Sequence, residues 1–304
     1  MSVYNGSSQL ARTIESVLAQ DGVEFEFVIV DDGSTDETPQ ILDDYARRDN
    51  RIRLIRQQNE GLTKALIRGC AAAKGTFIAR QDAGDISLPG RLEKQLSFFK
   101  EASGVSLVSC GTRFVGPQTE LLYEVSQDPS DATQRILTLD ASEIRGPSSH
   151  PSTMFLKASY EAVGGYRSAF YFGQDLDLWV RLAEVGTHAV INEVLYEAAI
   201  NVQSISGLYR REQMALKKII VESARLRRNG KDDGLVLKRA ELLKTNSKRP
   251  RSRRQRARAL YFIGSCLSRR GNPGAFQYFR QAAKTCPLHL KSVLKLMYGG
   301  LTRQ

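Results

Sequence analysis

The segment VEFEFVIVDDGS, residues 23–34, constrains the fold more than any other part of the sequence. Its β-branched and apolar residues predict a buried strand, which two acids, a glycine and a serine end at a loop. Helical patterns lie on either side of it, at residues 10–20 and 37–48, and further strands are expected at 51–57 and 76–82. This alternation predicts an α/β domain in which helices flank a mostly parallel sheet.

Acidic loops follow two of the predicted strands. Asp31 and Asp32 end the first of these strands, and Asp82 and Asp85 lie at the end of the second and just after it. In open α/β sheets, ligands bind beyond the carboxyl ends of the strands. We therefore expect both acidic loops to border one ligand site.

The C-terminal third of the chain has a different pattern. From about residue 207 the pattern is all helical, apart from a basic linker at 244–254 that Pro250 interrupts. Residues 256–287 predict two helices joined by Gly-Asn-Pro-Gly, and they resemble a single tetratricopeptide-type hairpin. We expect two parts, an α/β domain over residues 1–206 and a helical region over residues 207–304.

The net charge of +11 is concentrated in one segment. Residues 238–270 hold twelve Lys or Arg and one acid, Glu241, so this window alone carries a charge of +11. A basic patch near amphipathic helices favours peripheral contact with an anionic membrane surface. Solvated helix faces are the alternative, and contact with nucleic acid is the least favoured of the three.

The sequence shows no sign of a membrane span or of secretion. No run of about 18 apolar residues occurs, and Met1 does not lead into the basic start and apolar stretch of a signal peptide. Cys70, Cys110, Cys266 and Cys286 form no CxxC pair, so we expect reduced thiols and no zinc site. These features predict a cytoplasmic protein that associates at most peripherally with the inner face of a membrane.

Several motifs occur in a fixed order between Ser2 and Trp179. They are SVYNGSSQLARTIESVLAQ, FVIVDDGSTDETPQIL, FIARQDAGDISLPGRLEKQ, GGYR and QDLDLW. Over residues 1–206 this set resembles the family 2 glycosyltransferases. The resemblance implies a GT-A fold, with a Rossmann-like sheet, and an inverting transfer from a nucleotide-diphosphate sugar. It also implies a divalent cation, Mg²⁺ or Mn²⁺, that offsets the charge of the diphosphate.

The resemblance assigns roles to individual residues. Asp175, in QDLDLW, matches the catalytic base that removes the proton of the acceptor hydroxyl. It can also stabilise a helix N-terminus, and both roles can hold together. The implied donor-binding residues are Ser2 and Tyr4 in the nucleotide pocket, Asp32 at the base of the nucleotide, Lys64 at the diphosphate, Asp82 at the ribose or sugar, and His150 near the donor. Lys64 is equally well explained as a solvated lysine, and His150 nearly as well as a structural histidine.

The sequence departs from the family pattern at the expected metal site. The usual ligand falls on Gly84, which has no side-chain oxygen, and Ala199 and Asn201 stand where an arginine and a histidine are usual. Three explanations stay open: Asp85 acts as a substitute metal ligand, cationic side chains and helix N-termini replace the metal, or transfer is slow or absent.

The start of the chain departs from the pattern as well. Met1 takes the place of a methionine that the family puts near the end of a longer first strand. A shortened central strand would lose hydrogen bonds of the sheet. We expect that the natural reading frame begins upstream or that this form of the chain is less stable.

The sequence therefore predicts an inverting glycosyltransferase. Its acceptor would be a hydroxyl of a saccharide or of a lipid-linked acceptor, in the synthesis of cell-surface polysaccharide. The alternative is a catalytically weakened GT-A scaffold whose C-terminal hairpin recruits a partner. Gly84 and Asn201 favour the scaffold, whereas Asp32, Asp82 and Asp175 favour the enzyme.

Overall fold

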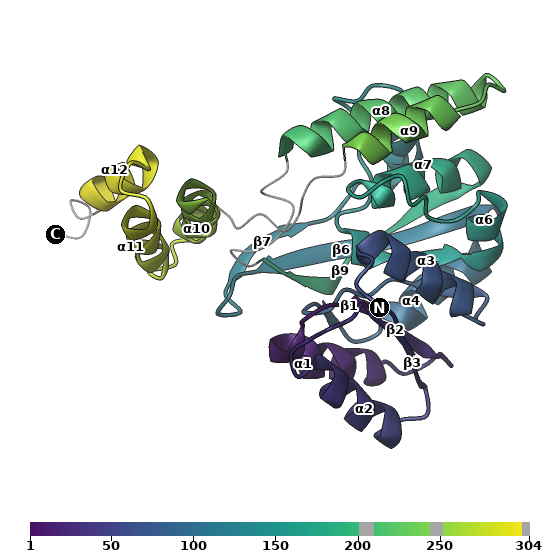
Figure 1. The fold of residues 1–304 in the computed structure, drawn as a ribbon, viewed down its shortest axis with the longest axis horizontal. Coiled ribbons are helices and arrows are strands. Elements are labelled where there is room, and N and C mark those ends of the chain that lie inside the picture. The colour runs from purple at the N-terminus through teal and green to yellow at the C-terminus, as the bar shows by residue number, and fades with distance from the viewer. Residues whose placement is uncertain (201–209, 244–251, 300–304) are drawn as a thin grey trace. The chain divides into compact units, whose positions relative to one another are not determined.

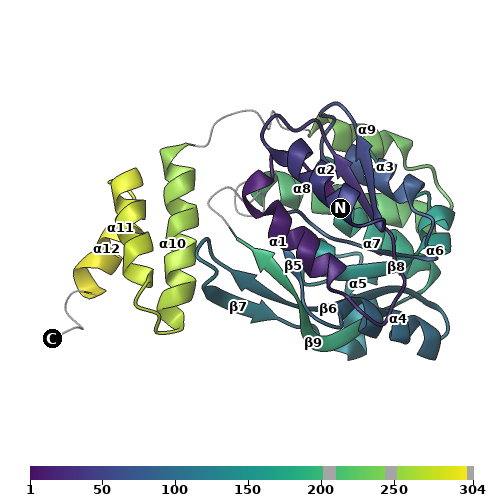
Figure 2. The same ribbon diagram turned by 90° about the horizontal axis from the view of Figure 1, so that it is seen from below.

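The computed structural model describes residues 1–200, 210–243 and 252–299 of the 304-residue chain. The chain divides into two compact units, which Figure 1 and Figure 2 show from two directions. The first unit comprises Met1–Thr112, Val125–Ala198 and Arg211–Lys244. The second comprises Arg113–Glu124, Ala199–Arg210 and Thr245–Gln304.

Strands and helices alternate from Ser2 to Ala79 and are mixed as far as Ala199, and only helices follow in the described part of the chain. The strands are β1 (Ser2–Val3), β2 (Phe27–Asp31), β3 (Ile52–Arg56), β4 (Phe77–Ala79), β5 (Ile86–Ser87), β6 (Val105–Val115), β7 (Leu121–Val125), β8 (Thr153–Leu156) and β9 (Thr187–Ala199). The helices up to β9 are α1 (Ser7–Leu18), α2 (Thr38–Arg48), α3 (Leu62–Ala72), α4 (Arg91–Glu101), α5 (Ala132–Leu137), α6 (Lys157–Ala162) and α7 (Gln174–Val185). Those after β9 are α8 (Arg210–Arg228), α9 (Gly234–Leu242), α10 (Arg253–Arg269), α11 (Ala275–Thr285) and α12 (Leu290–Gly299).

β1, β2 and β3 form a parallel sheet with β2 in the centre. α1 links β1 to β2 and α2 links β2 to β3, so each parallel pair has the crossover helix that such a pair needs. Leu10 and Ile14 of α1 and Leu42 of α2 pack with Ile29 of β2 in one buried cluster. In Figure 1, α1 and α2 lie side by side next to these strands. The β-α-β order expected from the sequence is confirmed here.

The second sheet has the order β4-β8-β6-β9-β5, and β7 pairs with β6. The pairs β4–β8, β6–β8 and β5–β9 are antiparallel. The expectation of a mostly parallel sheet therefore holds for the first sheet and is wrong for the second. β6 begins with eight consecutive buried residues, Val105–Thr112. A strand buried on both faces has this continuous pattern in either direction, so the sequence alone could not assign it.

The first strand is short and borders a cavity. β1 has two residues, and a cavity of about 420 Å³ lies between the first residues of β2 and β4. Apolar side chains of α3, β4 and α4 line it. The ammonium of Met1 donates to the carbonyl of Val28 at 2.8 Å, and burial lowers the pKa of this amine to about 5. The expectations about the natural start and the stability of this form stay predictions.

α8 and α9 belong to the first unit. Asp233, just before α9, forms an ion pair at 2.7 Å with Arg167, which precedes α7. Arg227 of α8 forms an ion pair at 3.1 Å with Glu184 of α7. These contacts fasten the two helices to the rest of the unit. The domain boundary expected at residue 206 stays a prediction.

The second unit has a core of its own. Ile263 of α10, Phe279 and Ala282 of α11 and Leu122 of β7 are buried in one cluster. The two helices expected within residues 256–287 are α10 and α11, while their likeness to a tetratricopeptide hairpin stays a prediction. Most of the expected basic linker, like Asn201, lies outside the described residues. Among the helices described, none is long and apolar enough to cross a membrane.

Candidate active site

The two acidic loops meet where the sheets join. Ser2 of β1 pairs with Val30 near the end of β2, and Ser2 also forms an isolated parallel bridge with Asp82, which follows β4. The loop that begins with Asp31 and Asp32 therefore lies next to the loop that carries Asp82. The structure brings the expected acids to the carboxyl ends of neighbouring strands.

Asp32 is almost fully buried and fixes the loop between β3 and α3. Its carboxylate accepts hydrogen bonds from the side-chain amide of Gln57 at 2.7 Å and from the backbone N–H groups of Glu60 and Gly61 at 2.9 Å each. Gly61 has a φ of 93°, a conformation that favours glycine and lets the chain turn onto the carboxylate. Asp32 thus shapes the wall of the site, and its expected bond to a nucleotide base stays a proposal.

Asn5 joins the loops after β1 and β2, a role that the sequence analysis missed. Its side-chain oxygen accepts from the N–H of Thr35 at 2.8 Å, and its own N–H donates to the hydroxyl of Ser34 at 3.0 Å. Asn5 has a φ of 50°, which asparagine tolerates better than most residues. The neighbouring Tyr4 is 51% exposed, so its side chain is accessible to a ligand beside these loops.

Lys64 lies in the first turn of α3 and has a protein partner. Its ammonium forms an ion pair with Glu60 at 2.8 Å, and both side chains are exposed. Exposed pairs at this spacing contribute little to stability, so a stronger anion could displace Glu60 at little cost. Lys64 is therefore exposed to solvent, as in the alternative that the sequence analysis left open. Its contact with a diphosphate stays a proposal.

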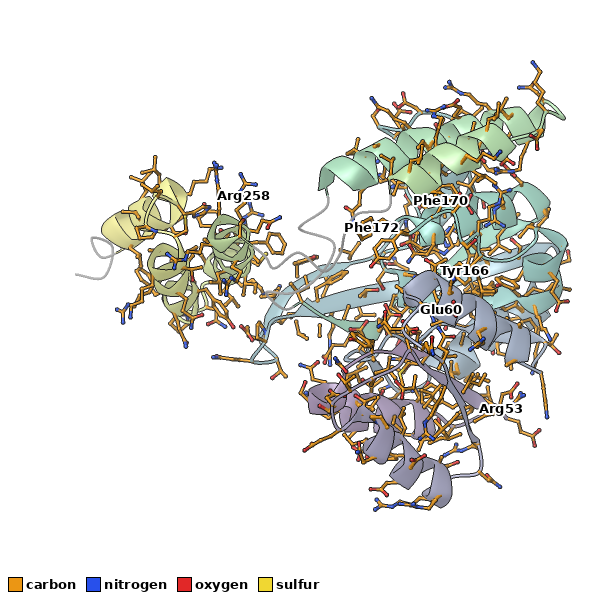
Figure 3. The ribbon with its side chains drawn as sticks, viewed as in Figure 1. Arg53, Glu60, Tyr166, Phe170, Phe172 and Arg258 are labelled. Atoms are coloured by element: carbon orange, nitrogen blue, oxygen red, sulfur yellow. The ribbon has the colours of Figure 1, made fainter. Side chains whose placement is uncertain are left out.

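Arg80 is the centre of a buried polar cluster that the sequence analysis missed. Its side chain is 3% exposed, forms an ion pair with Asp82 at 2.8 Å and donates to Nε2 of His150 at 3.4 Å. The hydroxyl of Tyr166, which Figure 3 labels, lies 2.6 Å from the same nitrogen. Because arginine can only donate, Nε2 of His150 accepts, and the hydroxyl of Tyr166 donates to it. Burial, and next the charge of Arg80, lower the pKa of His150 well below its usual value, so this histidine is neutral.

Asp82 is held by this cluster but stays accessible. Its side chain is 36% exposed, whereas that of Arg80 is almost fully buried. Arg80 stands two residues before Asp82 in FIARQDAGD, and in an extended segment that spacing puts both side chains on one face. This spacing is the signal from which the ion pair could have been predicted.

Arg91, in the LPGRLEKQ motif, is fully buried and holds the backbone around the site. Its guanidinium donates to the carbonyl of Arg80 at 2.7 Å and to that of Pro151 at 2.8 Å. It also lies over the ring of Tyr196, 4.8 Å from the centroid. The motif therefore ties the segment after β4 to the segment of His150, so its role is to shape the site.

Asp175 lies in the first turn of α7, as expected. Its carboxylate accepts from the N–H of Leu176 at 2.8 Å. The other acid of this turn, Asp177, is almost fully buried in an ion pair with Arg181 and is therefore structural. Burial raises the pKa of Asp175, and the carboxylate of Asp82 adds to that rise. A higher pKa makes a carboxylate a better proton acceptor in general base catalysis.

Four of these residues gather at one place. Asp175 lies close enough to Asp82 and Arg80 for their charges to shift its pKa, and close enough to Tyr166 to help raise the pKa of that phenol, which burial raises most. They come from the start of α7, from the segment after β4 and from the loop before α7. The structure thus unites the expected base with one expected donor-binding acid.

Gly84 and Asp85 occupy the expected metal site. Gly84 has a φ of 99°, where a side chain would be strained, and its N–H donates to the hydroxyl of Thr13 at 2.9 Å. Asp85 is 9% exposed, and its carboxylate accepts from the hydroxyl of Tyr196 at 3.1 Å. Within the described residues, no group of three or more His, Cys, Asp or Glu is arranged to hold a metal ion. Asp82 is the accessible carboxylate there, so these side chains alone do not fit a complete metal site.

Residues 1–161, more than half of the chain, match the family model described as Glycosyl transferase family 2. The chain belongs to glycosyl transferase family 2. Among its relatives, EpsE of Bacillus subtilis (strain 168) is 32% identical over 206 residues, covering 65% of this chain and 70% of EpsE. A chondroitin synthase of Escherichia coli is 26% identical over 203 residues, which cover 67% of this chain but only 29% of that synthase.

The fold comparison agrees with the family. The mannosyltransferase PcManGT from Pyrobaculum calidifontis, solved in complex with GDP-Man and Mn²⁺, aligns with 98% of this chain and 86% of its own, with a TM-score of 0.55 and 16% identity. The expected GT-A fold is confirmed. The protein is a glycosyltransferase, as the sequence predicted.

Proposed function

We propose that this glycosyltransferase inverts the anomeric centre of its donor sugar and that Asp175 is its catalytic base. The observation that carries the proposal is the setting of Asp175. Its pKa is raised by burial and it lies near Asp82 and Arg80, while the adjacent Asp177 is engaged with Arg181. A base must be both available and basic, and of the two acids in this turn Asp175 meets both conditions.

The proposed reaction is a single displacement. Asp175 takes the proton of an acceptor hydroxyl, and the oxygen forms a bond to the anomeric carbon from the face opposite the diphosphate. The bond between this carbon and the diphosphate oxygen breaks, and its electron pair leaves with the nucleoside diphosphate. The proton ends on Asp175, which returns it to solvent.

The donor is proposed to lie across the loops after β1, β2 and β4. Ser2, Tyr4 and Asp32 would border the nucleotide, and Asp82 would contact the ribose or sugar. Tyr4 and Asp82 are accessible, which supports these roles. His150 would act from behind Asp82, through Arg80, because it is buried and neutral.

A divalent cation is proposed to accompany the donor, as Mn²⁺ accompanies GDP-Man in PcManGT. Asp82 would be its main protein ligand, and Asp85, whose carboxylate accepts from Tyr196, would be the second. The cation would offset the charge that develops on the leaving diphosphate. If Asp85 takes part, Asp85→Asn should lower the affinity for Mn²⁺ in the presence of nucleoside diphosphate. EDTA should abolish transfer, and full activity in EDTA would contradict this part of the proposal.

The acceptor is proposed to be a saccharide or a lipid-linked saccharide in cell-surface polysaccharide synthesis. A polysaccharide synthase among the relatives supports this acceptor class, although the chain spans only 29% of it. We also propose that residues 238–270, with their charge of +11, bring the enzyme to an anionic membrane surface.

Replacing Asp175 with Asn tests the base. The amide keeps the shape and the bond from the N–H of Leu176 but cannot take a proton, so transfer should fall by about 10²- to 10⁴-fold. Calorimetry should show unchanged donor binding. Asp175→Glu, which keeps the carboxylate but moves it, should also lose most activity. Transfer by Asp175→Asn at the rate of the unchanged enzyme would exclude Asp175 as the base.

The rival function is that of a scaffold that no longer transfers sugar. The glycine at position 84 and the engaged carboxylate of Asp85 favour it. Calorimetry with UDP and GDP, each with and without Mn²⁺, separates the two functions. Binding of neither nucleotide under any of these conditions supports the scaffold.

A further inference from the structure

Three leucines are exposed in α12 and just before it. Leu288 and Leu290 are 88% and 70% exposed, and Leu294, one turn after Leu290, is 48% exposed. Ser292, between them, is fully buried and lies 2.7 Å from Nδ1 of His289. The helix thus turns a serine toward the protein and two of its leucines toward solvent, the reverse of the usual arrangement.

Basic side chains border these leucines. Lys291 and Lys295 are exposed, and each directly follows a leucine along α12. Arg254 and Arg258 of α10 lie close enough to His289 for their charges, with that of Lys291, to lower its pKa further after burial has lowered it. Figure 3 labels Arg258 on α10. The leucines and these basic residues therefore share one part of the second unit.

The end of the sequence has no acid that could neutralise this surface. Residues 242–304 contain fifteen Lys or Arg and no Asp or Glu. Residues 1–241 hold 29 basic and 33 acidic side chains, a net charge of −4. Solvated protein surfaces mix both signs of charge. Residues 242–304 carry positive charges and no negative ones, so they favour an anionic partner.

We infer that Leu288, Leu290 and Leu294, with Arg254, Arg258, Lys291 and Lys295 around them, form a surface that binds an anionic phospholipid bilayer. The leucine side chains enter the boundary between headgroups and acyl chains, and the basic side chains contact lipid phosphates. The inference deepens the proposed membrane contact of residues 238–270 by naming the apolar part of that surface, and it does not depend on glycosyl transfer.

The chemistry of the surface favours a bilayer over two other partners. A second copy of the chain would bring two acid-free, basic surfaces together, and their charges would repel each other. Single-stranded nucleic acid is bound by aromatic side chains on which bases stack, whereas the apolar side chains of this surface are leucines. Phe262 of α10 is 45% exposed, but its ring packs edge-on against Tyr123 of β7. Leucine between basic residues is typical of helices that lie in a membrane interface.

The test is co-sedimentation of the full chain with vesicles. We expect binding to vesicles of one part phosphatidylglycerol and two parts phosphatidylcholine, and binding weaker by about tenfold or more to pure phosphatidylcholine. The triple variant Leu288→Ser, Leu290→Ser, Leu294→Ser should bind the anionic vesicles about tenfold or more weakly. The matched control is Val185→Ser, Met214→Ser, Leu235→Ser, which removes three exposed apolar side chains of the first unit outside residues 238–270 and should bind as the unchanged chain does.

A second measurement reports on insertion. Leu290→Trp should show blue-shifted fluorescence with anionic vesicles and quenching by brominated acyl chains. The native Trp179 is 5% exposed, so its emission is a constant background. Vesicle binding that is unchanged in the leucine triple variant, or no binding at all, overturns the inference. So does a leucine variant that changes the oligomeric state in light scattering, since the leucines would then form a protein interface.

Discussion

Arg80 connects residues that the sequence treats separately. Burying a guanidinium is costly unless its donors are paired, and Arg80 is paired with Asp82 on one side and His150 on the other. The carboxylate that borders the donor site is thereby fixed in place, and the imidazole is kept neutral. In the proposed site, Arg80 would act on the donor through Asp82 and would therefore be a positioning residue.

Replacing Arg80 tests this position. Arg80→Gln should raise the KM for the donor by about tenfold or more with a smaller change in kcat, because a mobile Asp82 mainly weakens binding. Arg80→Lys, which keeps the charge but not the planar fork, should recover part of the loss. In the NMR titration of His150, Arg80→Gln should raise the pKa, since a nearby positive charge is removed. A loss of kcat alone, with the pKa of His150 unchanged, would contradict the assignment.

The pH profile of transfer tests Asp175 independently. Because burial and the carboxylate of Asp82 raise its pKa, kcat/KM should fall on the acid side with a midpoint above about 3.9, the value of an ordinary aspartate. Below that midpoint the rate should fall about tenfold per pH unit. Asp82→Asn should move the midpoint down. Circular dichroism at each pH controls for unfolding, and a midpoint at or below the ordinary value would count against Asp175.

At the scale of elements, the sequence predicted those strands and helices that a local pattern of residues marks. The strand that ends at Asp31 and the helix that begins beside Asp175 were both predicted, because burial period and terminal acids mark them. The direction of β6 in the sheet was not predicted, because its eight consecutive buried residues fit a parallel or an antiparallel strand. The bonds from Arg80 to His150 and from Arg91 to Pro151 were missed because they join segments far apart along the chain, which no local pattern encodes.

The cavity beside β1 leads to a prediction about this strand. In the parallel register, two residues added before Met1 would lie opposite Val28 and Phe27 and enter the cavity. A Val-Ile extension should raise the free energy of unfolding by about 1–3 kcal/mol through apolar burial. A Ser-Gly extension of the same length moves the ammonium but buries little, so it should give a smaller gain. Equal effects of the two extensions in denaturant titrations would contradict filling of the cavity.

The same extensions should also change how the free energy of unfolding depends on pH. The buried amine has a pKa of about 5 in the folded chain and about 8 when unfolded, so the unfolded state binds more protons between these values. Stability should therefore fall as pH falls from 8 to 5, by about 1.4 kcal/mol per pH unit from this group. Either extension should remove that slope.

At the scale of the whole molecule, each of the two units has its own buried core and a different kind of surface. The first unit has a buried cluster around β2, α1 and α2 together with the candidate active site, and the second has its own cluster around α10 and α11. Charge is divided as well, since residues 242–304 have no acid and the rest of the chain is slightly acidic. The proposed binding of the donor and the proposed binding of an anionic surface therefore fall in different units, each with its own buried core.

Matched core substitutions test this division. Ile263 of α10 and Ile14 of α1 are both fully buried, one in each unit. Replacing either with Ala should cost about 2–5 kcal/mol in the unit that contains it, through lost burial and the cavity left behind. Ile263→Ala should weaken hydrogen-exchange protection in α10 and α11 while nucleotide binding, measured by calorimetry, is retained. Ile14→Ala should weaken protection around β2 and lower nucleotide binding while α10 and α11 stay protected. A single transition that both substitutions shift equally would mean that the two cores unfold as one.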